Sequence, residues 1–315
     1  MDNAFLHPLI MIASAIVGLA AGALFDCSEG SVLIEPLLMT MLFVVFMCVS
    51  LKEIGKSFSN TRFTLTAILI NFVWTPIFAM ILGLIFPQID VRIGLLMLLV
   101  TPCTDWYLIF TATAKGNVPL SGSLLPVNLI LQIVLMPVYI LLFFNTSITI
   151  GVADLLTSMA IVLVIPIVAA TSIKWVSAHS SSVNKFSDAV TRNGDNLQLF
   201  FLCLAITAMF ASQSAELMNN LDLFILLLLP LIAFFVINYL VASLLSKIQK
   251  FDVKDTTSLI FTSMARNSPL SLAIAVAAFP DATLLLLVLV IGPLIELPIL
   301  SLTAGIRLKK AGQPS

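Results

Sequence analysis

Long apolar segments alternate with short polar separators along the whole chain. The apolar segments are continuous and rich in Leu, which favours buried or membrane-spanning helices over half-buried strands. Ten of them can cross the roughly 30 Å of a bilayer core, at residues 5–25, 32–51, 63–86, 91–114, 120–144, 150–173, 194–211, 221–246, 256–279 and 282–306. The separators leave no room for an inserted soluble domain. We therefore predict an all-α integral membrane protein with ten transmembrane helices.

The composition agrees with a membrane protein. Hydrophobic residues make up 60% of the 315 residues and charged residues 10%, against about 45–50% and about 25% in soluble domains. So few charges could not cover a soluble enzyme, and the net charge of -1 gives no basic surface for nucleic acid. The four cysteines are scattered, without the spacing of a zinc site or a disulfide framework. We expect no enzyme activity, no nucleic-acid partner, no metal and no cofactor.

The basic residues predict the orientation of the chain. On a ten-span path, thirteen of the fifteen Lys and Arg residues fall on the side of the two termini, Arg92 falls on the other side, and Arg266 lies within a span. Lys and Arg are retained on the cytoplasmic side of membranes. Both termini are therefore expected in the cytoplasm, in a multi-pass protein of the inner (plasma) membrane. The acidic start Met1-Asp2-Asn3 favours a retained first span over a cleaved signal.

Ten spans can be divided into two halves of five, residues 1–148 and 149–315. Because five is odd, the second half enters the membrane in the opposite sense, so the halves form an inverted repeat. In secondary transporters of this kind, discontinuous helices at matching positions of the two halves form the substrate site near the midplane. The fourth span of each half is the place to look.

Both fourth spans are interrupted by polar residues and proline. The first contains Pro102 and the second Pro269, and a proline removes a backbone donor and clashes with the preceding turn. Proline can also be a simple kink in a membrane helix, but the matching positions favour two crossed discontinuous helices, the fourth and the ninth. The candidate substrate-binding residues beside these prolines are Cys103, Thr104, Asp105, Arg266, Asn267 and Ser268.

Three charged side chains are predicted to lie deep in the membrane: Asp105, Arg266 and Glu296. Each costs at least about 2.5–3.5 kcal/mol to insert, so a partner or a polar cavity is expected. The acids could also serve as links between helices. Two acids and one base leave an excess negative charge, which suits a proton carrier, and we expect Glu296 and Asp105 to couple transport to ions. Asp105 and Arg266 are expected to shape the crossing point as a charge pair, although either acid could be the partner of Arg266.

These motifs resemble the bile acid:sodium symporter superfamily, and within it most closely the arsenical-resistance (arsenite efflux) permease branch. The residues that carry the resemblance are the segments 102–104, 115–121, 272–277 and 291–298. The resemblance covers nearly the whole chain and implies the inverted repeat with two broken helices. In sodium-coupled members, the ligands of sodium stand where this chain has Tyr107, Leu108, Thr262 and Arg266. Arginine has no acceptor for a metal ion, so sodium coupling is disfavoured.

In the arsenite permeases, a cysteine of the fourth span and a glutamate of the tenth are associated with transport, and they match Cys103 and Glu296. A thiolate is a soft ligand of the kind that suits trivalent arsenic, by analogy with soft metals. The resemblance thus implies alternating-access efflux of arsenite or a related metalloid in exchange for protons. The alternative is a sodium- or proton-coupled symporter of organic anions in which Arg266 pairs with a carboxylate. A membrane-embedded enzyme or sensor has no catalytic constellation to support it.

Overall fold

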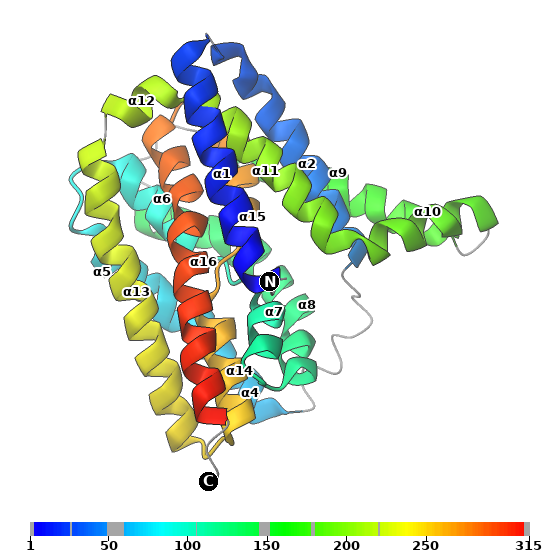
Figure 1. Ribbon diagram of the computed structural model, residues 1–315, viewed down its shortest axis with the longest axis vertical. Helices are drawn as coiled ribbons and strands as arrows, with labels where there is room; N and C mark the ends of the chain where they lie inside the picture. The colour runs from blue at the N-terminus through cyan, green and yellow to red at the C-terminus, as the bar shows by residue number, and fades with distance from the viewer. Residues whose placement is uncertain are drawn as a thin grey trace.

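The structure is a computed structural model that describes residues 3–25, 27–48, 60–104, 106–144, 152–177, 180–219 and 221–311 (Figure 1). Its helices are α1 (Asn3–Leu24), η1 (Ser28–Leu33), α2 (Ile34–Cys48), α4 (Thr61–Leu69), η3 (Ile70–Trp74), α5 (Thr75–Gly83), α6 (Ile89–Leu99), α7 (Trp106–Thr113), α8 (Val118–Phe144), α9 (Val152–Ser177), α10 (Ser181–Arg192), α11 (Gly194–Ser212), α12 (Ser214–Asn219), α13 (Leu221–Ile248), α14 (Val253–Met264), α15 (Ser268–Ala278) and α16 (Thr283–Ala311). Over these ranges no strand forms. The all-helical prediction is confirmed for them.

Five helices are each long and apolar enough to cross a membrane: Thr61–Gly83, Val118–Phe144, Ala160–Ser177, Ile225–Ile248 and Thr283–Lys310. The bent pair Ser181–Arg192 and Asn196–Ser212 makes a sixth if it is one span. Shorter apolar helices cover Leu9–Leu24, Ile34–Cys48 and Ser268–Ala278. These counts hold for the described residues. A helix lies in each of the ten predicted intervals, two of which contain a break, and the count of ten spans stays a prediction.

The segment between the predicted spans 150–173 and 194–211 contains a helix that the pattern of long apolar segments does not predict. In this helix, α10, Val183 and Val190 lie seven residues apart on one face and are partly or fully buried, whereas Phe186 is exposed. This spacing is that of an amphipathic helix. Its apolar residues are too few to stand out when the chain is searched for long apolar segments, and this is why the helix was missed.

The helices form two groups. In the first, α1 and α2 pack against α11, and α9 packs against α2. In the second, α16 packs against α6, and α13 against α14, with α4, α5, α7, α8 and α15 around them. Figure 1 shows the first group, in blue and green, leaning away from the yellow and red helices of the second. Each group takes helices from both halves of the chain.

Close backbone contact holds α6 against α16. A Cβ added at Gly94 of α6 would lie 2.8 Å from the carbonyl oxygen of Leu285, and one added at Gly292 of α16 would lie 2.6 Å from Leu98. Glycine is required at such approaches because any side chain would push the helices apart. This contact fixes the part of α16 that carries Glu296 beside the end of α6.

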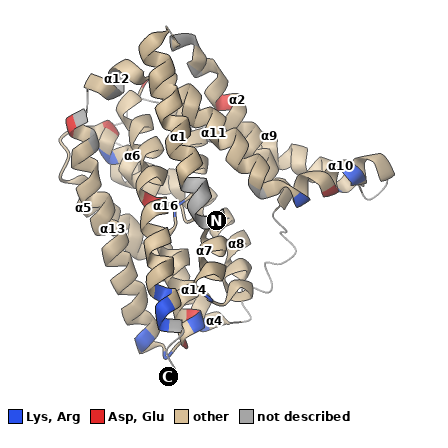
Figure 2. Cartoon of the chain, in the orientation of Figure 1, with Lys and Arg blue, Asp and Glu red and all other residues tan. Residues whose placement is uncertain are grey.

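Charged residues are unevenly distributed over the molecule. Figure 2 shows Lys and Arg gathered near the C-terminus, around the ends of α13 and α16, with further basic residues on α10. The turn after α7 lies at the same end as the start of α14, because the Asn117 amide donates to Asp255 at 2.8 Å. The end of α16 joins them through Arg307, whose guanidinium donates to the carbonyl of Val253 at 3.2 Å. Several basic segments that are distant in the sequence therefore share one end of the protein.

The contact between α1 and α11 depends on Gly18 and Gly22, which are four residues apart. A Cβ at Gly18 would lie 2.6 Å from the carbonyl oxygen of Thr207 and 2.8 Å from the Cβ of Phe210. The Thr207 hydroxyl also donates to the carbonyl of Ser14 at 3.2 Å. This is the small-residue packing that membrane helices use to approach closely, because lipid supplies no hydrophobic force between them.

We predict that Gly18→Ala lowers the stability of the protein by about 1–3 kcal/mol, because the added methyl group overpacks the α1–α11 contact. The matched control is Gly305→Ala in α16, where an added Cβ meets nothing within 4 Å. That substitution should leave stability unchanged or raise it by about 0.5–1 kcal/mol through helix propensity. Thermal unfolding of the purified variants in detergent measures both. Equal effects of the two substitutions would contradict the close α1–α11 contact.

Candidate functional site

The two helix breaks lie side by side and pair with each other. An isolated antiparallel bridge joins Pro102 to Arg266. The N–H of Cys103 donates to the carbonyl of Ala265 at 3.0 Å, and the N–H of Asn267 donates to the carbonyl of Thr101 at 2.7 Å. Backbone groups inside a membrane protein must find partners within the protein, since lipid offers none. Each break therefore supplies the hydrogen bonds that the other one needs.

Asn267 explains where the second break ends. Its side-chain oxygen accepts from the N–H of Leu270 at 3.2 Å and so caps α15, and its amide donates to the hydroxyl of Thr104 at 3.1 Å. Pro269 lies in the first turn of α15, where a missing N–H costs nothing. The sequence correctly indicated a break here. The break lies just before Pro269, which stands in the first turn of the helix that follows it.

A hydroxyl pair fastens the start of α15 to the end of α6. Thr101 and Ser271 lie with their hydroxyl oxygens 2.7 Å apart. The carbonyl oxygen of Met97 lies 2.8 Å from the Ser271 hydroxyl and 3.0 Å from the Thr101 hydroxyl, so one hydroxyl can donate to this carbonyl while the other donates to its neighbour. Both side chains are fully buried. They hold the two halves of the crossing in a fixed register.

Arg266 is buried, with 3% of its surface exposed, and its guanidinium faces acceptors of the protein itself. Nη1 donates to the carbonyl of Leu99 at 2.9 Å, and Nε to that of Met264 at 3.2 Å. Nη2 donates to the side-chain oxygen of Asn71 at 3.1 Å and to the carbonyl of Ser263. Leu99 ends α6 and Met264 ends α14, so the guanidinium joins the ends of both interrupted helices.

Two further contacts orient this guanidinium. The ring of Phe234 lies beneath it, with the centroid 5.0 Å from Cζ, which is a cation–π distance. Asn71 lies in η3, a π-helical turn, and its amide donates to the carbonyl of Thr262 at 3.2 Å. Wide turns of this kind are frequent at functional sites. The amide oxygen of Asn71 is thereby turned toward Arg266.

Glu296 approaches the crossing from α16 and is likewise 3% exposed. Its Oε1 accepts from the main-chain N–H of Arg266 at 2.9 Å. The two charged residues are thus neighbours, but the hydrogen bond between them uses the backbone of Arg266 and leaves the guanidinium to the acceptors described above. The expected pair of Asp105 with Arg266 cannot be compared, since Asp105 lies outside the described residues.

Prolines in α16 make its backbone part of the site. Pro293 has no N–H, so the carbonyl of Leu289, four residues earlier, has no partner within the helix. The hydroxyl of Ser268 donates to that carbonyl. Pro298 lies on the other side of Glu296. Glu296 therefore sits on a locally loosened stretch of helix that is tied to the start of α15.

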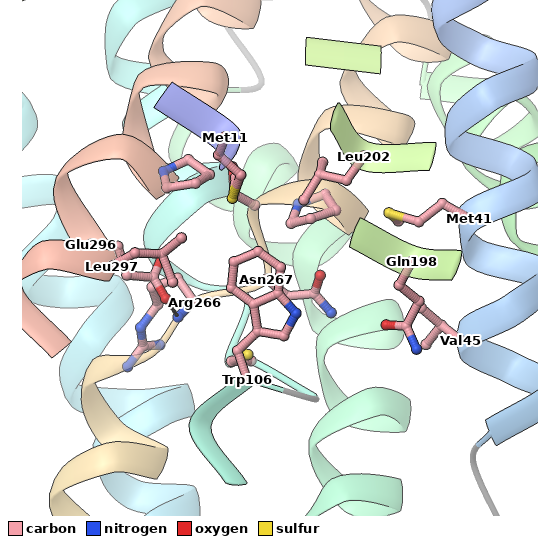
Figure 3. A pocket seen from close by; sticks show the side chains of 14 residues that line it. Met11, Met41, Val45, Trp106, Gln198, Leu202, Arg266, Asn267, Glu296 and Leu297 are labelled. Atoms are coloured by element: carbon pink, nitrogen blue, oxygen red, sulfur yellow. Dashed lines mark hydrogen bonds between the residues drawn. The ribbon is translucent and has the colours of Figure 1, made fainter. Parts of the chain in front are cut away.

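The crossing opens onto a cavity between the two helix groups, and the empty space in the cavity and its open mouth together is about 480 Å³. The second group contributes Cys103, Trp106, Arg266, Asn267, Ser268, Pro269, Pro293, Glu296 and Leu297. The first group contributes Met11, Met41, Val45, Gln198 and Leu202. Figure 3 shows Glu296 and Arg266 on one side, Met41 and Gln198 on the other, and Trp106 between them. The cavity is mostly apolar, with a few polar groups directed into it, as ligand sites usually are.

The structure brings together most of the residues that the sequence predicted as site residues. Five of them line the cavity: Cys103, Arg266, Asn267, Ser268 and Glu296. Thr104 is fully buried and reaches the site through its hydrogen bond to Asn267. Sequence reasoning missed the wall made by α1, α2 and α11. Its residues belong to uninterrupted apolar helices, and Gln198 is the one polar residue among the described residues that line the cavity from this side.

Comparison with known proteins identifies the class of this chain. Residues 35–221, more than half of the chain, match the Sodium Bile acid symporter family. The arsenical-resistance protein Acr3 of Corynebacterium glutamicum is 21% identical over 74% of this chain and 66% of its own length, just under two thirds. The "Uncharacterized protein YbaS" of Bacillus subtilis is 25% identical over 87% of this chain and 88% of its own length.

The matched region begins in α2 and ends at the start of α13, so it includes the first helix break and most of the wall that faces it. An inner cavity between two groups of helices fits a carrier of small molecules. The chain belongs to the Sodium Bile acid symporter family, and it is a multi-pass membrane transporter and not an enzyme.

Proposed function

We propose that this transporter exports arsenite or a related trivalent metalloid in exchange for protons. The observation that carries the proposal is that Cys103 and Glu296 line the same cavity. A thiol and a carboxyl group there provide a soft contact for the metalloid and a group that can bind the exchanged proton. The name of Acr3, an arsenical-resistance protein, supports the substrate at the level of a distant relative.

The far wall of the cavity strengthens the choice of a soft substrate. Met11 and Met41 are buried residues of α1 and α2 that line this wall (Figure 3). Thioethers and thiols are polarizable ligands, and they bind soft species better than they bind hard cations. With Cys103 on the opposite wall, sulfur is available to the substrate from both helix groups.

A neutral substrate also agrees with the state of Arg266. The hydrogen bonds to Leu99, Met264, Ser263 and Asn71 use four of the five N–H donors of its guanidinium. A bidentate grip on a carboxylate would have to break some of these bonds. The alternative substrate, an organic anion held by Arg266, therefore has weaker support, whereas undissociated arsenite carries no charge to be neutralised.

Protons are the proposed coupling ion. Glu296 faces the cavity and is held by a single described hydrogen bond, from the main chain of Arg266, so it can take up and release a proton without dismantling the crossing. Asp105, outside the described residues, stays a second proposed proton carrier. The guanidinium of Arg266 repels a metal cation and offers it no acceptor, which disfavours sodium.

The proposed topology has ten spans, with both termini in the cytoplasm of the cell that carries the protein in its inner membrane. Helices in all ten predicted intervals support the count. Lys115, Lys254 and Arg307 come from three separate parts of the chain and share the end near the C-terminus. The positive-inside rule assigns that end to the cytoplasm.

The proposed mechanism is alternating access between two inverted repeats, residues 1–148 and 149–315. Support comes from the pairing of one break from each repeat, Pro102 with Arg266. The first helix group contributes one cavity wall and the second contributes the crossing, so rocking of one group against the other would open the cavity to either side in turn. In this mechanism the second group holds the substrate site at the crossing, and the first group moves to open and close the cavity.

We predict that Cys103→Ser lowers arsenite transport at least tenfold, because a hydroxyl is a hard ligand, and leaves the unfolding temperature within a few degrees of wild type. Uptake of radiolabelled arsenite into inside-out vesicles with an imposed proton gradient measures transport. Cys203→Ser, in α11 and away from the lining of the cavity, is the matched control and should transport normally. Full transport by Cys103→Ser would remove the thiol from the mechanism. A wild type that moves no arsenite but binds carboxylates would favour the organic-anion carrier.

We predict that Glu296→Gln uncouples transport from the proton gradient. Glutamine keeps the shape and one acceptor oxygen for the N–H of Arg266 but cannot exchange a proton. Downhill movement of arsenite should continue, whereas accumulation against its gradient should be lost at every pH. The control is Glu35→Gln at the start of α2, outside the cavity lining, which should keep the wild-type pH profile. An unchanged pH profile in Glu296→Gln would indicate that Asp105, and not Glu296, carries the proton.

A further inference from the structure

The ends of α6 and α14 converge on one small region of negative potential. Leu99 is the last residue of α6, and Ser263 and Met264 are the last two of α14. Carbonyls in the last turn of a helix have no partner within that helix and carry the negative end of its dipole. The side-chain oxygen of Asn71 adds a fourth oxygen, from η3. Four acceptors from three elements thus surround the same guanidinium.

Such a group of carbonyl and amide oxygens is the kind of environment in which proteins hold small hard cations. Here the guanidinium of Arg266 fills it, with hydrogen bonds of 2.9 Å to Leu99, 3.1 Å to Asn71 and 3.2 Å to Met264, and a further one to Ser263. Phe234 covers the face of the guanidinium. The group is thus enclosed on its edges and on one face.

We propose that the Arg266 guanidinium is a tethered cation that takes the place of a bound metal ion and holds the two interrupted helices together. The oxygen group formed by Leu99, Ser263, Met264 and Asn71 is a cation site whose occupant is part of the chain. Arg266 is then a positioning residue for the cavity and not the partner of a substrate. When its side chain is removed, the site should accept a free small cation.

The oxygen group and Phe234 fit a planar cation with a permanent charge, such as a guanidinium. Asn71 is fixed by its own hydrogen bond to the carbonyl of Thr262, so its oxygen stays directed at Arg266. Glu296 accepts a hydrogen bond from the main-chain N–H of Arg266 and leaves its guanidinium to these oxygens. A guanidinium keeps its charge at every physiological pH. The crossing consequently stays assembled in all states of the cycle, without any ion binding or leaving.

The test measures thermal unfolding of the purified full-length protein in detergent and needs no substrate, so its outcome is separate from that of the metalloid proposal. Arg266→Ala should lower the unfolding temperature by on the order of 10 °C, because the buried acceptors lose their partner. Millimolar guanidinium chloride should restore at least half of the loss, with choline chloride as the inert salt. Wild type should respond equally to sodium chloride and choline chloride.

Arg307→Ala is the matched control, because Arg307 is also buried but bonds only to residues of one helix, Val253 and Thr257 of α14, among its described contacts. It should lose stability and regain none with guanidinium. If Arg266→Ala yields no folded protein, Arg266→Met keeps the aliphatic stem and takes its place. Recovery by guanidinium or sodium in the Arg266 variant alone supports the tethered cation. Equal recovery in both variants, no recovery in either, or stabilisation of wild type by sodium over choline would overturn it.

Discussion

Two helices that stop inside a membrane protein leave backbone carbonyls and amides without partners, and lipid cannot supply any. In this protein the solution is mutual: the break after α6 and the break after α14 are hydrogen-bonded to each other through Cys103, Ala265, Thr101 and Asn267. The carbonyls of Leu99, Ser263 and Met264 at the two helix ends accept hydrogen bonds from one guanidinium, that of Arg266. Most other features of the site follow from this arrangement, including the fixed register of α15 and the position of Glu296.

The same constraint accounts for the polar residues that surround the breaks. Ser268 satisfies the carbonyl that Pro293 leaves open in α16, and Asn267 caps α15 while it binds Thr104. These side chains already make hydrogen bonds within the protein, and a ligand would have to compete with those bonds. The groups that remain for a substrate are concentrated on Cys103, Glu296 and the facing wall of α1, α2 and α11. Because the hydrogen bonds of the framework already occupy Arg266, the cavity supports the proposal of a small uncharged substrate.

Much of this could be predicted from the sequence, since length, hydropathy and proline act locally. The apolar segments located the helices, and Pro102 with the run from Arg266 to Pro269 located both breaks. The partners of Arg266 could not be predicted, because main-chain carbonyls have no signature in the sequence. Met11 and Met41 were missed for a related reason: in an apolar helix, only the fold decides which residue faces a cavity. The short helix α10 has too few apolar residues to be recognised by length.

The charges explain how one cavity can have both a rigid and a responsive part. Arg266 is bound by acceptors from α6, α14 and η3, and a change in its contacts would disturb three elements at once. Glu296 is bound to the crossing by one described hydrogen bond, on a stretch of α16 between two prolines. Loss of the Arg266 charge would leave buried acceptors of three elements without a donor, whereas a protonated Glu296 can still accept the hydrogen bond from the main-chain N–H of Arg266. The permanent positive charge therefore builds the site, and the carboxyl group beside it is the one that we propose as a proton carrier.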